Sequence, residues 1–165
     1  GKNESLITRT REAQDGATPS GNSVTALNLL RLGRLTGDSG MEEKADALIR
    51  SFSGQVAEYP MAYTQFLHAV DFMIGPTQEV VIAGDPEQQA SLTMLHFVHG
   101  RFPTRKVTLL VSGPDVRARL STIAPFVENM TSSDGKATAY VCRQYACQAP
   151  VTDPQEMEKV ILETA

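Results

Sequence analysis

The chain has 165 residues, of which 41% are hydrophobic and 21% charged, and its formal net charge is −4. This length and composition are typical of one ordinary folded domain or two small ones, and they exclude wholesale disorder. An acidic chain without a stripe of Lys and Arg repels a phosphate backbone, so we expect no nucleic-acid partner. The longest apolar stretches, 80–83 and 107–111, are far shorter than the roughly 20 residues that cross a bilayer, so we expect no membrane partner.

The chain contains two cysteines, Cys142 and Cys147. Two are too few for the disulfide scaffold of a small secreted protein and too few for a four-cysteine zinc site. We therefore expect a cytoplasmic protein without a metal or another cofactor.

Helical periodicity dominates the first 75 residues. A polar loop with two glycines and a proline, 15–23, comes first, and its Ser and Asn side chains are suited to cap the helix that follows. The predicted helices run over residues 24–36, 41–52 and 60–73. The second has a clear apolar face, and the third is apolar on most sides, which predicts burial on most sides.

The pattern changes after Gly75-Pro76 to short apolar strands that alternate with helices. The predicted strands are residues 79–84, 106–111 and 137–142. Helices are predicted near residues 92–100, 116–123 and from Pro154 onward. Strands that alternate with helices favour βαβ units and a parallel sheet.

The expected fold is therefore mixed α/β, with three N-terminal helices, a small three-stranded, mainly parallel βαβ unit and a closing C-terminal helix. We divide the chain into a helical segment, 1–75, and an α/β unit, 76–165, whose last helix returns to the helical part.

Two stretches carry a resemblance to a known family. Residues 15–23, DGATPSGNS, lead into 28–32, NLLRL, and residues 142–153 read CRQYACQAPVTD. Both stretches resemble motifs of the spermatogenesis-associated protein 20-like family. Because they lie at opposite ends of the chain, the resemblance covers essentially all of it.

Members of that family pair an N-terminal thioredoxin-like domain with a six-hairpin helical barrel similar to glycosidases and N-acylglucosamine epimerases. The resemblance implies that this chain is the C-terminal portion of such a protein, that 1–75 belongs to part of the barrel, and that the α/β unit is inserted near its end. It also implies two partners, the rest of the parent chain and a sugar-like small molecule. No C-x-x-C motif occurs in this sequence, so the redox chemistry of the thioredoxin-like domain does not carry over.

The loop 15–23 is the first candidate site, because loops of this kind line the cavity of such barrels. Asp15 would act there as a general acid or base, and Ser20, Asn22 and Ser23 would bind the substrate. The alternative is that these side chains satisfy the turn and cap the helix. His68 is a second catalytic candidate, since barrel epimerases use histidines as acid–base groups, and its alternative is a buried core histidine.

Cys142 and Cys147 form a C-x₄-C pair at the end of the last predicted strand. They would form a redox-active disulfide if their Cα atoms came within about 7 Å. The alternative is two small, half-buried residues. His96 and His99 share one side of a helix, but no carboxylate or cysteine stands in register, so we expect no metal there.

Residues 83–86 and 112–115 follow the first two predicted strands, where parallel sheets bind ligands. Neither matches a dinucleotide-binding or P-loop pattern. An Asp in each turn repels phosphate and a Pro removes an amide donor. We therefore expect these turns to serve packing and partner contact.

Two functions remain open. In the first, the parent protein binds or processes a carbohydrate-like substrate and this chain forms one wall of the site. In the second, the chain is a non-enzymatic interaction module whose α/β unit is a docking surface. Because most of the barrel is missing, we also expect the chain to self-associate or to repack its helices.

Overall fold

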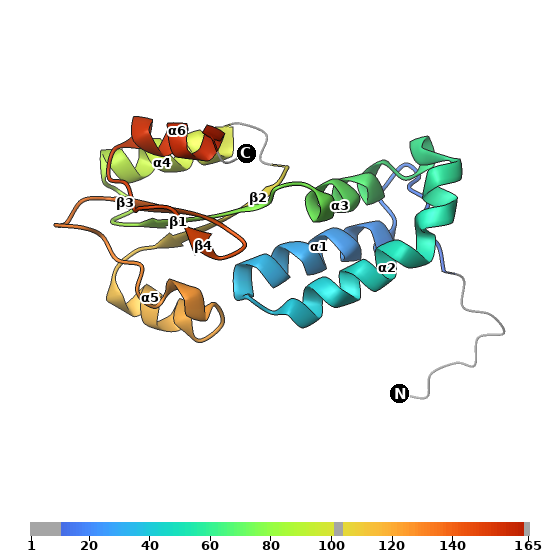
Figure 1. Ribbon diagram of the computed structural model, residues 1–165, viewed down its shortest axis with the longest axis horizontal. Coiled ribbons are helices and arrows are strands. Elements are labelled where there is room, and N and C mark those ends of the chain that lie inside the picture. Colours follow the sequence, from blue (N-terminus) through green and yellow to red (C-terminus); the bar gives the residue numbers. More distant parts are fainter. Residues whose placement is uncertain (1–10, 101–103, 164–165) are drawn as a thin grey trace.

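The computed structural model describes residues 11–100 and 104–163 and shows a helical part beside a sheet that is covered by helices (Figure 1). Its elements are α1 (Gly21–Thr36), α2 (Ser39–Glu58), η1 (Pro60–Ala62), α3 (Thr64–Ile74), β1 (Gln78–Ala83), α4 (Gln89–Gly100), β2 (Lys106–Val111), α5 (Pro114–Ser121), η2 (Pro125–Val127), β3 (Thr138–Arg143), β4 (Ala146–Cys147) and α6 (Pro154–Glu163). The predicted mixed α/β fold is confirmed. The division at residue 75 stays a prediction, and residues 1–10 of its first segment lie outside the described residues.

The three N-terminal helices share one core. α1 and α2 form a hairpin through Gly37, which has the left-handed φ of 77° that suits a glycine at a helix C-terminus. The fully buried members of this core come from all three helices: Ala26, Ala45, Phe66 and Ala69. Gly33 allows α1 and α2 to approach closely, because a Cβ there would lie 2.7 Å from Cγ of Glu42.

The prediction that the third helix is buried on most sides is wrong. Phe66 and Phe72 face the core, whereas His68 is exposed and Ile74 is 72% exposed. Other large apolar side chains of the helical part are also exposed: Val24, Leu32, Tyr59 and Met61. Self-association of the chain stays a prediction.

The sheet has the strand order β2-β1-β3-β4. β1 and β2 are parallel, from Gln78 opposite Lys106 to Ala83 opposite Val111, and α4 connects them as the predicted βαβ unit. β3 runs antiparallel to β1, and the short β4 runs antiparallel to β3. The expectation of a mainly parallel, three-stranded sheet is thus corrected. The chain leaves β2 through the short α5 and returns through η2, so β3 begins at the same edge where β1 and β2 end.

Each face of the sheet has its own cover. α4 and α6 lie on one face, and α5 with η2 lies on the other, as Figure 1 shows. We expected α6 to return to the helical part, but it packs beside α4, with Met157 and Ile161 fully buried against the sheet. Gln78 donates a hydrogen bond of 2.9 Å from Nε2 to the carbonyl of Ile161. Within the described residues, none of the helices combines the length and the apolar content that a membrane span requires.

Candidate functional site

The Asp15 carboxylate ties the first loop to two helices. Its Oδ1 accepts hydrogen bonds from the amide of Ser20 (2.8 Å) and the hydroxyl of Ser23 (2.7 Å), immediately before and within the first turn of α1. Its Oδ2 accepts from the amides of Gln65 (2.8 Å) and Phe66 (3.4 Å) in the first turn of α3. Asp15 therefore caps α3 from 50 residues away and leaves neither oxygen without a protein donor.

These hydrogen bonds also affect the pKa of the Asp15 carboxyl group. Burial alone would raise the pKa of Asp15, but the hydrogen bonds to its oxygens, led by that from Ser23, outweigh burial and hold the pKa below its ordinary value. A general acid at neutral pH needs the opposite shift. The geometry therefore favours the capping interpretation, and the catalytic role of Asp15 stays a prediction.

The three side chains expected to bind substrate also form hydrogen bonds within the N-terminal segment. Ser20 Oγ accepts from the amide of Ser23 (3.1 Å) and donates to the carbonyl of Ala13 (3.0 Å). Asn22 Nδ2 donates to the carbonyl of Glu12 (2.7 Å), and Ser23 is fully buried. The structure thus brings Asp15, Ser20 and Ser23 together, but as a hydrogen-bonded turn.

The histidines lie elsewhere. His68 is on the exposed side of α3, so the prediction of a core histidine is wrong. Its neighbour Asp71 pairs with Arg105, whose guanidinium lowers the pKa of that carboxyl. His96 and His99 are exposed on α4. Within the described residues, no three His, Cys, Asp or Glu side chains are placed to hold a metal ion.

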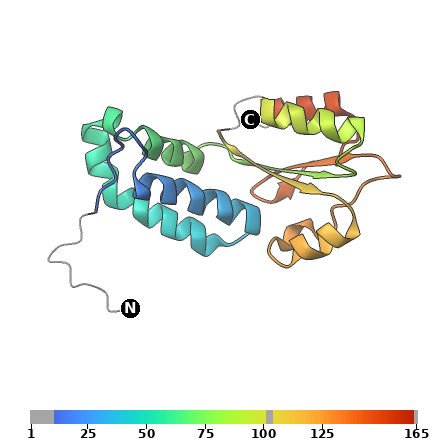
Figure 2. The ribbon, with the colours of Figure 1, turned by 180° about the vertical axis from the view of Figure 1, so that it is seen from behind.

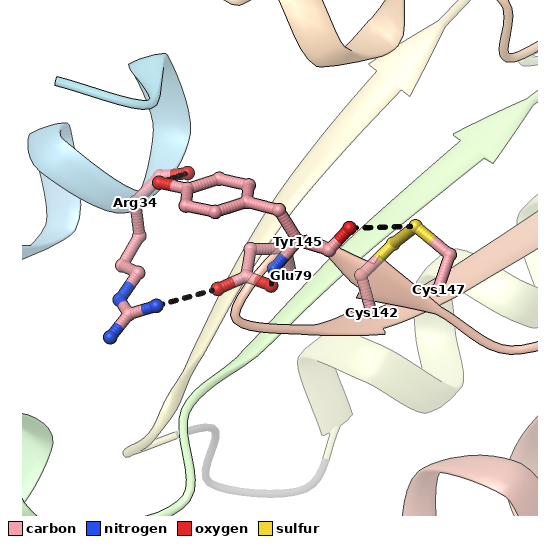
Figure 3. Close-up of a disulfide and its surroundings, with 5 residues drawn as sticks. All are labelled: Arg34, Glu79, Cys142, Tyr145 and Cys147. Carbon is pink, nitrogen blue, oxygen red and sulfur yellow. Dashed lines mark hydrogen bonds and ion pairs between the residues drawn. A yellow bond between two sulfur atoms is a disulfide. The ribbon is translucent and has the colours of Figure 1, made fainter.

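Cys142 and Cys147 form a disulfide across β3 and β4 (Figure 3). Their Cα atoms are 3.8 Å apart, well inside the limit set from the sequence. Cys142 is buried in the sheet, at 2% exposure, whereas Cys147 is exposed. One sulfur of the pair thus belongs to a solvent-accessible residue, which thiol–disulfide exchange requires.

The disulfide closes a turn with unusual backbone geometry. The two residues between β3 and β4, Gln144 and Tyr145, both have left-handed backbones, with φ of 50° and 62°. Two-residue hairpin turns of this kind usually contain Asn and Gly, because a side chain costs about 1–2 kcal/mol in the left-handed region. Such a turn persists only where the surrounding structure holds it.

Tyr145 supplies that support by reaching the helical part. Its amide donates to Oε2 of Glu79 (3.2 Å), and its hydroxyl donates to the carbonyl of Gly33 near the end of α1 (3.0 Å). Its ring lies 5.4 Å from that of Phe126. The turn between β3 and β4 is therefore hydrogen-bonded to both β1 and α1.

Glu79 is the buried centre of this contact, at 1% exposure on β1. Nη1 of Arg34 lies 3.4 Å from its Oε1, and Nε of Arg34 lies 3.0 Å from Glu42. Burial raises the pKa of Glu79, offset in part by the Tyr145 amide and by Arg34. Burial, together with the carboxylates of Glu42 and Glu79, raises the pKa of Tyr145 to about 12, so its hydroxyl stays a hydrogen-bond donor at neutral pH.

We call Arg34, Glu79 and Tyr145 the junction cluster (Figure 3). It joins the helical part to the sheet at the disulfide-closed turn. Sequence reasoning missed it, although one signal was present: Glu79 is an acidic residue at the start of a strand predicted to be buried. A buried carboxylate requires a partner, but the sequence does not show which cation supplies it.

The predicted strand-to-helix turns also come together. Residues that follow β1 and β2 line one pocket of about 400 Å³, with a further wall from the segment before β3. A second groove, of about 340 Å³, lies between α1, α2 and α3.

Comparison with known proteins finds relatives that match most of the chain. It is 36% identical over 156 residues to spermatogenesis-associated protein 20 of Rattus norvegicus and 35% identical to that of Homo sapiens, in each case over 94% of this chain. The chain is homologous to a segment of that protein. It spans about a fifth of the length of these relatives. An uncharacterized protein of Caenorhabditis elegans is 27% identical over 95% of the chain and 21% of its own length.

The expected relationship to spermatogenesis-associated protein 20 is thus confirmed for a segment of that protein. No family model and no solved structure matches the chain. The place of this segment in the parent and its membership of a helical barrel stay predictions.

Proposed function

We propose that this chain is a non-catalytic module of a larger protein and that the Cys142–Cys147 disulfide controls how its α/β unit is fastened to its helical part. The observation that carries the proposal is the junction cluster, in which the turn closed by the disulfide places Tyr145 against Glu79 and α1. The saturated Asp15 carboxylate supports the non-catalytic part.

The redox step is a thiol–disulfide exchange with a dithiol. A thiolate of the dithiol attacks Sγ of the exposed Cys147, and the Cys142 sulfur leaves as a thiolate that takes up a proton. The second thiol of the dithiol then attacks the mixed disulfide, releases the Cys147 thiol and completes a disulfide in the reductant. Two electrons pass to the chain, and a disulfide in the expected cytoplasmic setting is reversible in this way.

Reduction acts on the turn. Without the cross-link, the left-handed backbones of Gln144 and Tyr145 are no longer held from both sides, and the turn relaxes toward right-handed geometry. Tyr145 then withdraws its hydroxyl from Gly33 and its amide from Glu79. The α/β unit keeps its sheet but loses part of its attachment to α1.

We expect reduction with excess dithiothreitol to lower the free energy of unfolding by about 2 kcal/mol. This is the stabilisation expected when a disulfide closes so short a loop and reduces the entropy of the unfolded chain. Amide hydrogen exchange should speed up at Tyr145 and in the last turn of α1, and remain slow in β1. Urea unfolding and exchange followed by NMR measure both effects.

Two variants serve as controls for this experiment. The Cys142→Ser/Cys147→Ser double variant should have the stability and amide exchange of the reduced chain. Neither should change when dithiothreitol is added. Tyr145→Phe keeps the disulfide but removes the hydroxyl, so it should loosen α1 alone. Equal exchange at α1 in the oxidised and reduced chain would contradict the proposal.

A second candidate function is the binding of a sugar-like ligand in the groove between α1, α2 and α3. Its lining includes the carboxylates of Glu42, Glu43 and Asp46 and the apolar side chains of Leu30 and Phe72. Carboxylates accept hydrogen bonds from sugar hydroxyls, and apolar side chains suit the carbon face of a sugar ring.

Saturation-transfer NMR of the full-length parent against a panel of sugars tests this candidate. We expect signals that fall at least about threefold in Glu43→Gln and stay unchanged in Glu87→Gln, an exposed residue outside the groove. If the folded parent gives no saturation-transfer signal with any of these sugars, it does not bind them and this candidate function is wrong for the panel.

A further inference from the structure

The pocket at the ends of β1 and β2 lies at a switch point of the sheet. The chain leaves β1 toward α4 on one face and leaves β2 toward α5 on the opposite face, as Figure 2 shows. Adjacent parallel strands whose connections diverge in this way leave a crevice outside their carboxyl ends, and open α/β sheets bind ligands there. The pocket of about 400 Å³ occupies this crevice and is large enough for a small molecule.

The two walls of the pocket carry opposite charges. Arg117, in the first turn of α5, lines it from one side and is half-buried, with no ion pair to any described residue. Asp85, which follows β1, lines it from the other side, where Oδ1 accepts from the amide of Glu87 (2.9 Å). The hydroxyl residues Ser112, Thr131 and Ser132 also line the pocket.

Glycines keep the pocket open. Gly113 and Gly135 line it with left-handed backbones, φ of 90° and 73°, so side chains are disfavoured at both positions. Behind the lining residue Gly84 lies Ser91, whose Oγ is 3.0 Å from the place a Cβ of Gly84 would take. That hydroxyl is fully buried and has no hydrogen-bond partner among the described residues. Buried hydroxyls without a partner are rare, and this one lies next to a residue that lines the pocket.

We propose that this pocket binds a small carboxylate that carries hydroxyl or ammonium groups at its other end. The carboxylate pairs with Arg117, and the donor groups face Asp85 and the hydroxyl residues. A phosphate dianion fits less well, because its second negative charge is repelled by Asp85 and Pro114 supplies no amide donor. The opposed charges thus select a ligand with an anionic and a donor end.

The test is a titration of the ¹⁵N-labelled chain followed by NMR, with D-gluconate and 4-aminobutyrate as ligands. D-glucitol, which lacks the carboxylate, and inorganic phosphate serve as comparisons. We expect saturable shifts of the Gly84, Gly113 and Gly135 amides with D-gluconate or 4-aminobutyrate. Asp85→Asn should weaken 4-aminobutyrate more than D-gluconate, which distinguishes an ammonium from a hydroxyl at that end.

Arg117→Gln should weaken binding roughly tenfold, as expected for the loss of one charge-assisted hydrogen bond. Arg119→Gln is the matched control, because Arg119 lies on the same helix but outside the pocket, and it should bind as the wild type does. The proposal is overturned by no saturable shift with either carboxylate, by equal weakening in the two Arg variants, or by D-glucitol or phosphate binding as tightly as the carboxylates.

Discussion

Arg34→Ala is expected to lower the free energy of unfolding by about 3 kcal/mol at pH 7. Its guanidinium is the cation beside the buried Glu79, and removing it leaves a carboxylate at 1% exposure that still accepts from the Tyr145 amide but has lost its cation. Removal of one partner of a buried pair typically costs 3–5 kcal/mol, and the partial exposure of Arg34 places this pair at the low end. Urea unfolding at equilibrium measures the loss.

The loss should shrink as the pH falls. A raised pKa means that folded Glu79 binds its proton more tightly than the unfolded chain does, so the group opposes folding increasingly as the pH rises through its folded value. In Arg34→Ala that pKa rises further, and acidification toward the ordinary value of 4.5 neutralises the stranded carboxylate. We therefore expect a smaller loss at pH 5 than at pH 7.

Two further variants test whether the loss of the Arg34–Glu79 ion pair causes the loss of stability. Arg31→Ala, an exposed arginine on the same helix, should change stability by less than about 0.5 kcal/mol. Adding Glu79→Gln to Arg34→Ala should regain most of the loss, because the amide keeps an acceptor for Tyr145 and carries no charge. An Arg34→Ala loss that is independent of pH and is not relieved by Glu79→Gln would show that Arg34 acts through its packing or its ion pair with Glu42, and not through Glu79.

The sequence predicted which segments form helices and strands better than how they are arranged. The apolar face of α2 is buried as its periodicity indicated, at Ala45, Ile49 and Phe52. Apolar residues that recur with a period of 2 or 3.6 indicate that one face of a strand or helix is buried. They do not indicate which element covers that face. The apolar face of α6 with Met157 was therefore recognised, whereas its position beside α4 was not.

The sequence did not specify the direction of β3, for a similar reason. Strand composition does not encode direction, which depends here on the path through α5 and η2 back to the edge where β2 ends. The contacts of Asp15 with Gln65 and of Tyr145 with Gly33 span 50 and 112 positions. No local motif contains them, although the loop 15–23 and the cysteine pair were both singled out from the sequence.

Asp15→Ala is expected to lower the free energy of unfolding by about 2 kcal/mol, measured by urea unfolding at pH 7. An N-cap aspartate with one acceptor contact contributes about 1 kcal/mol, and Asp15 accepts from Ser20, Ser23, Gln65 and Phe66 at the starts of two helices. Asp38→Ala is the matched control, because Asp38 caps α2 through the amide of Gly40 alone and should cost about half as much.

The pH dependence separates this cap from a catalytic acid. A lowered pKa means that Asp15 stabilises the fold above its ordinary value of 3.8, and that this stabilisation is lost as the pH falls through the folded value. The difference between the wild type and Asp15→Asn should accordingly vanish in strong acid, and Asn, with one acceptor oxygen in place of two, should retain part of the cap. If Asp15→Ala is as stable as the wild type, the capping interpretation is wrong and Asp15 is again a candidate for catalysis. A large loss instead means that any drop in activity of the parent must be corrected for the folded fraction before Asp15 is given a chemical role.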